Sequence, residues 1–354
     1  MKKIGIVTIN DYNFGNRLQN YAMLKVLSNY GDVENIVRYF DAENLTFAAS
    51  LKKKIKKFIK TIIGRLKKYR NFDKFNKKYI KNSKYKFSKN LNYNKLNNYF
   101  DYFVAGSDQV WNPIFFKNNM YINMLGFTPC EKRIAVAPSI AIETLNEEQQ
   151  SEFKKYLSNF KALSCREQQG SELITSLINK EVQTLIDPTL MLSADDWDKV
   201  IVKPKCHNEK EKYILLYFLG TMTKEYEEKI DNLSKKFKLK IINLKLDTNY
   251  LDCGPSEFVY LIKNAQLVIT DSFHGSVFSV LYDRPLLILE RQEKYLKSMN
   301  TRITNLLDKL HLNDNVYTNA NKVISLDVKY DKTYLKLEQE KVKEFLNKNI
   351  CEQK

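Results

Sequence analysis

The segment from Ser272 to Gly275 combines side chains that can cap a helix, carry a proton and attract an anion. It follows an apolar run at 267–270 and precedes a helical pattern. Ser272 can cap that helix, whose first backbone N–H groups form an anion site. The imidazole of His274 can add charge or a proton, and Gly275 would let a ligand approach the backbone closely. We predict an anion-binding site with a catalytic His274; a histidine that only satisfies the helix cap is the alternative.

A second polar segment, Ser107 to Trp111, follows the apolar run 102–105. Asp108 can accept a proton from a hydroxyl group, and Trp111 can stack on a sugar ring. These residues, with Gln109, predict a sugar-acceptor site in which Asp108 is catalytic. The alternative is an ordinary Asp turn beside a tryptophan that fills the core.

Two further segments place polar residues after apolar runs. Asn16, Arg17 and Gln19 follow the run 3–9 at the start of a helical pattern, but the glycine fingerprint of a dinucleotide site is missing. Arg166 follows another run and can bind a carboxylate or phosphate through its forked guanidinium. A salt bridge to a neighbouring acid is the alternative role for Arg166.

The elements that position these residues are apolar runs that alternate with helical patterns. Strands are predicted at 3–9, 33–39, 102–105, 133–137, 162–165, 182–186, 213–219, 239–244, 267–270 and 285–289. This alternation indicates α/β domains with largely parallel sheets, in which ligands bind at the carboxyl ends of strands. We predict two Rossmann-like domains that face a cleft, at 1–195 and 213–330, with a linker at 196–212 and a charged helix in 331–354.

The chain of 354 residues, longer than one core usually supports, carries a formal net charge of +17. Residues 51–99 contain 18 Lys and Arg and one acid, so the whole excess lies there. Apolar residues recur every three or four positions within 51–72, which predicts a basic amphipathic helix inserted in the first domain. It can pack on that domain, lie on an anionic membrane surface, or do both. Nothing resembling a nucleic-acid-binding fold accompanies it, so we expect no nucleic-acid partner.

No run approaches the roughly 20 apolar residues of a membrane span, and no signal peptide is recognisable at the first residues. The five cysteines are scattered and only three histidines are present, so we expect free thiols and no metal site. These features favour a cytoplasmic protein that is peripheral on the inner face of the membrane.

The motifs, taken in order, resemble those of the polysaccharide pyruvyl transferase family. One alone would be weak, but the ordered set, which spans residues 5 to about 310, is specific. The matching segments are Phe14-Gly15-Asn16-Arg17-Leu18-Gln19-Asn20-Tyr21-Ala22, Gly106-Ser107-Asp108-Gln109-Val110-Trp111-Asn112, Ser164-Cys165-Arg166-Glu167, Asp187-Pro188-Thr189-Leu190, Gly254-Pro255-Ser256-Glu257-Phe258, Ile269-Thr270-Asp271-Ser272-Phe273-His274-Gly275 and Thr301-Arg302-Ile303.

The resemblance implies a two-domain fold of the glycosyltransferase B (GT-B) type and transfer of the enolpyruvyl unit of phosphoenolpyruvate to a sugar, with a pyruvate ketal and phosphate as products. It implies that His274 and Arg166 contact the donor. Characterised members often carry an arginine where this chain has Ser272, and Arg291 or Arg302 is predicted to replace it.

The resemblance further implies phosphoenolpyruvate as donor substrate without a separate cofactor, and a cell-surface glycan or its lipid-linked precursor as acceptor. A nucleotide-sugar glycosyltransferase and a non-catalytic carbohydrate- or membrane-associated protein are the alternatives. The predicted donor-binding residues are Arg166, Ser272, His274, Gly275, Arg291 and Arg302, and the predicted acceptor-binding residues are Asn16, Arg17, Gln19, Ser107, Asp108, Gln109 and Trp111.

Overall fold

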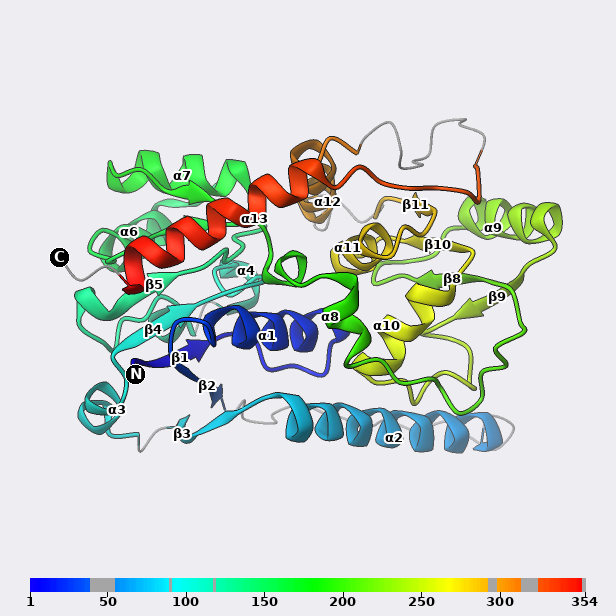
Figure 1. Cartoon of the computed structure of the whole chain (residues 1–354), viewed down its shortest axis with the longest axis horizontal. Coiled ribbons are helices and arrows are strands. Elements are labelled where there is room, and N and C mark those ends of the chain that lie inside the picture. The colour runs from blue at the N-terminus through cyan, green and yellow to red at the C-terminus, as the bar shows by residue number, and fades with distance from the viewer. Residues whose placement is uncertain (39–54, 89–90, 117–118, 292–297, 313–323, 352–354) are drawn as a thin grey trace.

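The first domain is built on a five-stranded parallel sheet (Figure 1). The computed structural model describes residues 1–38, 55–88, 91–116, 119–291, 298–312 and 324–351. The strands are β1 (Lys3–Val7), β2 (Asp32–Arg38), β3 (Asn82–Phe87), β4 (Tyr102–Ala105) and β5 (Arg133–Ala135), in the order β3-β2-β1-β4-β5. A two-stranded parallel pair, β6 (Ser164–Cys165) and β7 (Gln183–Thr184), follows.

Helices cover both faces of this sheet because successive side chains of its strands point in opposite directions. Ile4 and Ile6 share one apolar cluster with α1 (Phe14–Leu27). Val7 and Ala105 belong to the other, with α3 (Tyr93–Tyr99), α6 (Glu147–Leu157) and α7 (Gln168–Ile178). Burial on both faces explains why the central strands read as continuous apolar runs.

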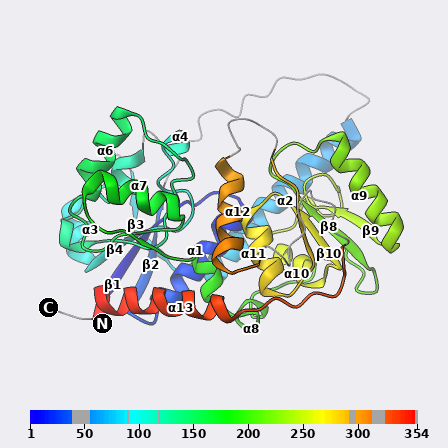
Figure 2. The same ribbon diagram turned by 90° about the horizontal axis from the view of Figure 1, so that it is seen from above.

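The second domain has a four-stranded parallel sheet. Its strands are β8 (Tyr213–Tyr217), β9 (Lys240–Asn243), β10 (Leu267–Thr270) and β11 (Leu286–Ile288), in the order β11-β10-β8-β9. Its helices are α9 (Lys224–Phe237), α10 (Pro255–Asn264) and α11 (Phe273–Leu281), followed by α12 (Ser298–Lys309). Viewed from above, the two sheets lie side by side with α1, α11 and α12 between them (Figure 2).

An apolar cluster continues from the first domain into the second. The ring of Phe14 stacks on that of Phe258 with centroids 4.7 Å apart. The ring of the fully buried Trp197 contacts the rings of Tyr21 in the first domain and Phe278 in the second, with centroid distances of 5.5 Å and 4.8 Å. Around these aromatic side chains the two domains are therefore packed against each other.

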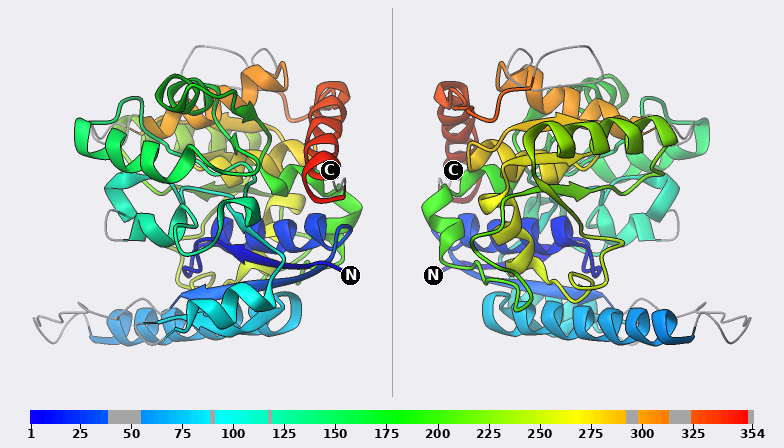
Figure 3. Two further views of the ribbon diagram at one scale, coloured as in Figure 1. Left: turned by 90° about the vertical axis from the view of Figure 1, so that its left-hand side faces the viewer. Right: turned by 90° about the vertical axis from the view of Figure 1, so that its right-hand side faces the viewer.

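Two helices cross the domain boundary on opposite sides of the molecule (Figures 1 and 3). One is α2 (Ile55–Tyr79), whose Phe72 and Phe75 are buried and whose Asn71 amide donates to the backbone of Asp252 at 2.7 Å. The other, α13 (Thr333–Leu346), follows the second domain but returns to the first, where Gln339 donates to the carbonyl of Leu190 at 2.6 Å.

The remaining short elements connect these units. They are α4 (Pro113–Phe116), α5 (Met120–Asn123), a 3₁₀ turn at Cys130–Lys132, another at Pro188–Met191, α8 (Ala194–Asp198) and a π turn at Asn347–Cys351. Residues 199–212, in the predicted linker, contain no helix or strand.

The ten predicted strands are confirmed to within a few residues, and the predicted basic helix is confirmed as a longer one that ends at Tyr79. Strand β3 was not predicted. Part of the predicted helix, residues 51–54, lies outside the described residues. All five cysteines are free, as expected. Within the described ranges, no helix is long and apolar enough to cross a membrane, and no three His, Cys, Asp or Glu side chains are grouped as a metal site would require.

Candidate active site

Arg166 is the centre of a buried polar cluster at the carboxyl end of the first domain's strands. It directly follows β6, and its Nη1 lies 2.9 Å from Oδ2 of Asp187 and 3.7 Å from Oδ1 of Asp108. Its Nε lies 3.4 Å from Oε1 of Glu167. Burial acts to lower the pKa of Arg166, but the three carboxylates raise it above its ordinary value. This arginine therefore stays charged.

Asp187 is a member of this cluster to which the sequence analysis gave no role. It caps the 3₁₀ turn that follows it, with Oδ1 accepting from the backbone and hydroxyl of Thr189 at 3.0 and 2.7 Å. Its Oδ2 accepts from Oγ of Ser107 at 2.9 Å. Burial acts to raise the pKa of Asp187, but His274, Arg166 and the Thr189 hydrogen bonds lower it below its ordinary value. Because Asp187 directly follows the predicted strand 182–186, its position in the sequence could have identified it as a site residue.

The second domain contributes His274 from the first turn of α11. Ser272 caps this helix as predicted, accepting from the backbone N–H of Gly275 at 3.4 Å. Nε2 of His274 lies 3.9 Å from Oδ1 of Asp187 and has no hydrogen-bond partner in the part of the chain that the structure describes. Burial lowers the pKa of His274, and the Asp187 carboxylate only partly opposes this. The histidine therefore rests in its neutral form at pH 7, next to a carboxylate of the other domain.

Arg302 of α12 enters the same cluster from another direction. Its Nη1 lies 3.5 Å from Oδ1 of Asp108, and its buried Nε has no hydrogen-bond partner among the residues described. The ring of Phe273 lies close to both guanidinium groups, with its centroid 4.3 Å from Cζ of Arg166 and 5.8 Å from Cζ of Arg302. Burial, together with the neighbouring charge of Arg166, lowers the pKa of Arg302 to about 10.

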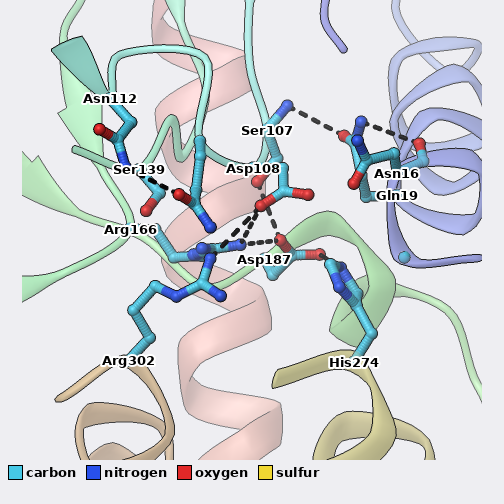
Figure 4. Close-up of polar contacts among 12 residues, drawn as sticks. Asn16, Gln19, Ser107, Asp108, Asn112, Ser139, Arg166, Asp187, His274 and Arg302 are labelled. Atoms are coloured by element: carbon cyan, nitrogen blue, oxygen red, sulfur yellow. Dashed lines mark hydrogen bonds and ion pairs between the residues drawn. The ribbon is translucent and has the colours of Figure 1, made fainter. Parts of the chain in front are cut away.

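Figure 4 shows how these side chains converge: Arg166 and Arg302 point at Asp108 and Asp187, while His274 faces Asp187 from the opposite side. A cavity of about 20 Å³ lies beside them, lined by Arg166, Asp187, Phe273 and Arg302 among others. That volume holds about one water molecule. A substrate with several heavy atoms therefore requires these side chains or the two domains to move apart.

The residues predicted from the N-terminal helix support the cluster from the first domain. Gln19 donates to Oγ1 of Thr8 at 2.8 Å and accepts from the backbone N–H of Ser107 at 3.1 Å. It thereby fixes the turn that carries Asp108, whose φ is +58°. Asn16 lies beside Gln19 and accepts a hydrogen bond through its backbone carbonyl (Figure 4). Arg17, from the same helix, instead contacts Oδ1 of Asn10 through its Nη1 at 3.4 Å.

Two predicted site residues, Trp111 and Gly275, need correction. Trp111 is completely buried and its indole N–H donates to the carbonyl of Asn123 at 3.1 Å, so the prediction that it stacks on a sugar is wrong. Gly275 faces Thr270, whose Oγ1 would be 2.7 Å from an added Cβ, so the glycine serves helix–strand packing and not the approach of a ligand. The burial of Trp111 and the tight space beside Gly275 both result from close packing, which the sequence pattern alone did not reveal.

Arg291 and Gln109 have partners outside the central cluster. Nε of Arg291 donates to Oδ2 of Asp271 at 3.1 Å, and the same carboxylate accepts from the backbone N–H groups of Leu219 and Gly220 at 2.7 Å each. Arg291 therefore helps to hold the loop after β8. Gln109 accepts from the amide of Asn112 at 2.8 Å. Of the two arginines predicted to supply the additional cation, Arg302 is the one that contacts Asp108.

Two parallel α/β domains with polar residues meeting between them define the GT-B class of fold. A structure from Listeria monocytogenes, provisionally assigned as a UDP-N-acetylglucosamine 2-epimerase, has a TM-score of 0.50 at 10% identity, with 98% of this chain and 95% of that one covered. The Staphylococcus aureus MnaA–UDP structure has a TM-score of 0.46 at 12% identity, covering 100% and 99%. The Escherichia coli heptosyltransferase WaaC with ADP has a TM-score of 0.39 at 10% identity, covering 98% and 99%.

The family is established by the sequence. The model for polysaccharide pyruvyl transferases matches residues 13–293, which is most of the chain. No curated protein matches the sequence. The chain therefore belongs to the polysaccharide pyruvyl transferase family and is a transferase with two Rossmann-like domains.

Proposed function

We propose that this protein transfers the enolpyruvyl group of phosphoenolpyruvate to a cell-surface glycan or its lipid-linked precursor, forming a pyruvate ketal. The observation that carries the proposal is the convergence of Arg166, Arg302 and His274 at the domain boundary, in a chain of this family. Two guanidinium groups and an imidazole suit a donor with one carboxylate and one phosphate, because charge-assisted hydrogen bonds to both oxyanions are strong.

The proposed reaction begins with protonation of the donor's methylene carbon. His274 supplies this proton, which leaves positive charge at the carbon that bears the phosphate ester. A sugar hydroxyl adds to that carbon and gives its proton to Asp108. A second hydroxyl of the same sugar then displaces phosphate, which leaves with the proton of that hydroxyl. Asp108 releases its proton to solvent and His274 takes one up, so that one donor and one diol yield one ketal and one phosphate. The two arginines stabilise the donor's negative charges throughout.

The donor itself would prepare His274 for this role. Burial lowers the pKa of this histidine, so it is neutral when the site is empty. A phosphate dianion near its unpartnered Nε2 favours the imidazolium form and raises the pKa again. Proton uptake by the general acid is thereby coupled to donor binding.

A thermal-shift titration tests the choice of donor. Phosphoenolpyruvate at a hundred times its Kd stabilises a single-site protein by about 2.7 kcal/mol, so the melting temperature should rise. The rise should be lost in Arg302→Gln, because this variant lacks the guanidinium group proposed to bind the donor. Arg284→Gln is the matched control, since this arginine donates to the backbone of Tyr282 in the loop between α11 and β11.

The same titration includes UDP, ADP and UDP-sugars. A shift with a nucleotide and none with phosphoenolpyruvate would replace the proposal with a nucleotide-sugar glycosyltransferase. No shift with any of these compounds would favour a non-catalytic carbohydrate- or membrane-associated protein. A phosphoenolpyruvate shift retained in Arg302→Gln would remove Arg302 from the donor site.

We further propose that the protein is cytoplasmic and peripheral on the inner face of the membrane, held there by the basic surface of α2. Phe72 and Phe75 of this helix are buried in the protein, whereas Leu66 and Tyr69 are 62% and 42% exposed beside the lysines. A groove of about 510 Å³ between α2 and the linker is bordered by Lys67, Arg70, Lys74, Lys78, Lys203 and Lys205. Anionic lipid attracts such a surface by about 1 kcal/mol per basic residue.

Vesicle sedimentation tests this membrane proposal. Binding should require phosphatidylglycerol and weaken as salt rises, because exposed charges are screened. The double variant Lys67→Glu/Arg70→Glu should lose binding, whereas Lys235→Glu/Lys236→Glu on α9 should retain it. Equal binding to neutral vesicles, or equal loss in both variants, would contradict the role of α2.

A further inference from the structure

Two arginines of the first domain are buried and form no salt bridge with any residue that the structure describes. Arg38, at the end of β2, is 6% exposed, and none of its three guanidinium nitrogens has a hydrogen-bond partner among the described residues. Arg17, on α1, is 5% exposed; within the same part of the chain its Nε has no partner, and its Nη1 makes a long contact of 3.4 Å with Oδ1 of Asn10. The proposed donor site uses neither residue.

The side-chain acceptor that Arg17 contacts is shared with two asparagine amides, while Oδ1 of Asn20 accepts no hydrogen bond among the described residues. Oδ1 of Asn10 is shared by Arg17, by the amide of Asn20 at 3.5 Å and by that of Asn35 at 3.2 Å. Asp11 acts on both guanidinium groups electrostatically. Yet among the described residues no carboxylate oxygen lies within 4 Å of a guanidinium nitrogen of Arg17 or Arg38, the distance expected of a salt bridge. One more acceptor group would therefore complete this cluster.

Burial of an unpaired cation is costly, which makes the arrangement informative. A buried ion carries a penalty of several kcal/mol unless it is paired and hydrogen-bonded. Burial lowers the pKa of Arg17 and of Arg38 to about 10 each, so both are still charged at neutral pH. A pair of charged, unsatisfied guanidinium groups is the arrangement expected of a site that an anionic ligand fills.

The position of the pair fits ligand binding on the acceptor side. Asn10 follows β1 and Arg38 ends β2, and these neighbouring parallel strands end at the same edge of the sheet. That edge is where ligands bind in open α/β sheets. Helix α1 carries both Arg17 and Gln19, which contacts Ser107 in the turn that holds Asp108.

We propose that Arg17 and Arg38 together bind a phosphate group carried by the acceptor. The inference rests on the proposed transfer to a glycan or its lipid-linked precursor and narrows the acceptor to a phosphorylated one. The guanidinium fork matches phosphate geometry, so two such groups can bind one phosphate through several charge-assisted hydrogen bonds.

The experiment measures binding of glucose 1-phosphate and of inorganic phosphate by calorimetry. All variants carry Arg302→Gln, so that phosphate binding at the donor site is weakened. Glucose 1-phosphate should bind this parent, and its Kd should rise at least about tenfold in Arg38→Met and in Arg17→Met, which corresponds to about 1.4 kcal/mol each. Arg284→Met is the control and should leave the Kd unchanged.

Thermal unfolding without ligand separates a binding role from a structural one. Arg38→Met should melt at the same or a higher temperature, because it removes an unpaired buried charge and keeps the side-chain volume. A Kd for glucose 1-phosphate that is unchanged in both variants would overturn the inference, as would binding of inorganic phosphate alone. These readouts need neither phosphoenolpyruvate nor turnover, so failure of the proposed donor would not be mistaken for failure of this site.

Discussion

Gly15 lies where the first domain touches the catalytic histidine proposed for the second. A Cβ added there would overlap Nδ1 of His274 and lie 2.7 Å from Cγ and 2.8 Å from Cε1 of the same ring. Real Cβ contacts are not that short, so Gly15→Ala must displace the imidazole or separate the domains. Overpacking of this kind costs about 1–3 kcal/mol. We therefore expect Gly15→Ala to lower the free energy of unfolding by that amount and to reduce transferase activity.

A double-mutant cycle with His274→Ala isolates the contact. Removing the imidazole makes room for the new methyl group, so Gly15→Ala should then be neutral or gain the roughly 0.5–1 kcal/mol of an alanine in a helix. The coupling free energy should be about 1–3 kcal/mol, as expected for residues in contact. Gly5→Ala is the control: its added Cβ would meet Ile36 and Phe100, so His274→Ala should not change its cost.

Urea unfolding followed by tryptophan fluorescence provides the free energies. Trp111 and Trp197 are both fully buried, the first in the core of the first domain and the second between the domains. An equal cost of Gly15→Ala with and without the His274 ring would refute the contact. A change in the m-value would show that the two cores no longer unfold together, and would require separate analysis of each transition.

Two further predictions follow from burial. Because burial lowers the pKa of His274 in the folded protein, the unfolded chain, with an ordinary pKa of about 6.5, binds the proton first as pH falls. Wild type should therefore lose more stability than His274→Gln between pH 7.5 and 5.5 in urea titrations; a parallel loss would contradict it. Trp111→Ala should cost about 3–5 kcal/mol as a core truncation. Trp111→Phe should leave the acceptor KM unchanged, whereas a raised KM would restore the sugar-stacking role.

The strands and the motifs after them could be predicted because they depend on local pattern. Buried parallel strands read as apolar runs, and the helix cap at Ser272 needs only neighbouring residues. Strand β3 was missed for the opposite reason. It is an edge strand, Asn82–Phe87, whose lysines alternate with partly buried residues, and charge on an edge strand discourages pairing with other chains. Its composition therefore resembles a solvated segment.

The contacts between segments distant in the sequence could not be predicted. Nothing near Trp111 shows that Asn123 will accept from its indole, and nothing near Gly15 shows that a histidine 259 positions later will occupy the space beside it. The same holds for Arg38, which ends a strand of mixed apolar and polar residues and whose burial without a described partner appears only when the neighbouring strand and helix are in place. Tertiary packing decides these roles.

The carboxylate of Asp108 occupies the position that an anionic donor needs. Its Oδ1 lies 3.7 Å from Arg166 and 3.5 Å from Arg302, the two arginines proposed to bind phosphoenolpyruvate. Donor oxyanions that take these guanidinium groups must release Asp108, and the released carboxylate can then accept the proton of a sugar hydroxyl. Donor binding would thus activate the acceptor.

Asp108→Asn should bind phosphoenolpyruvate more tightly than wild type in calorimetry, because a competing charge is removed. Its kcat should fall about 10²–10⁴-fold, because the general base is lost. Weaker donor binding in this variant would show that Asp108 positions the arginines and does not compete for them.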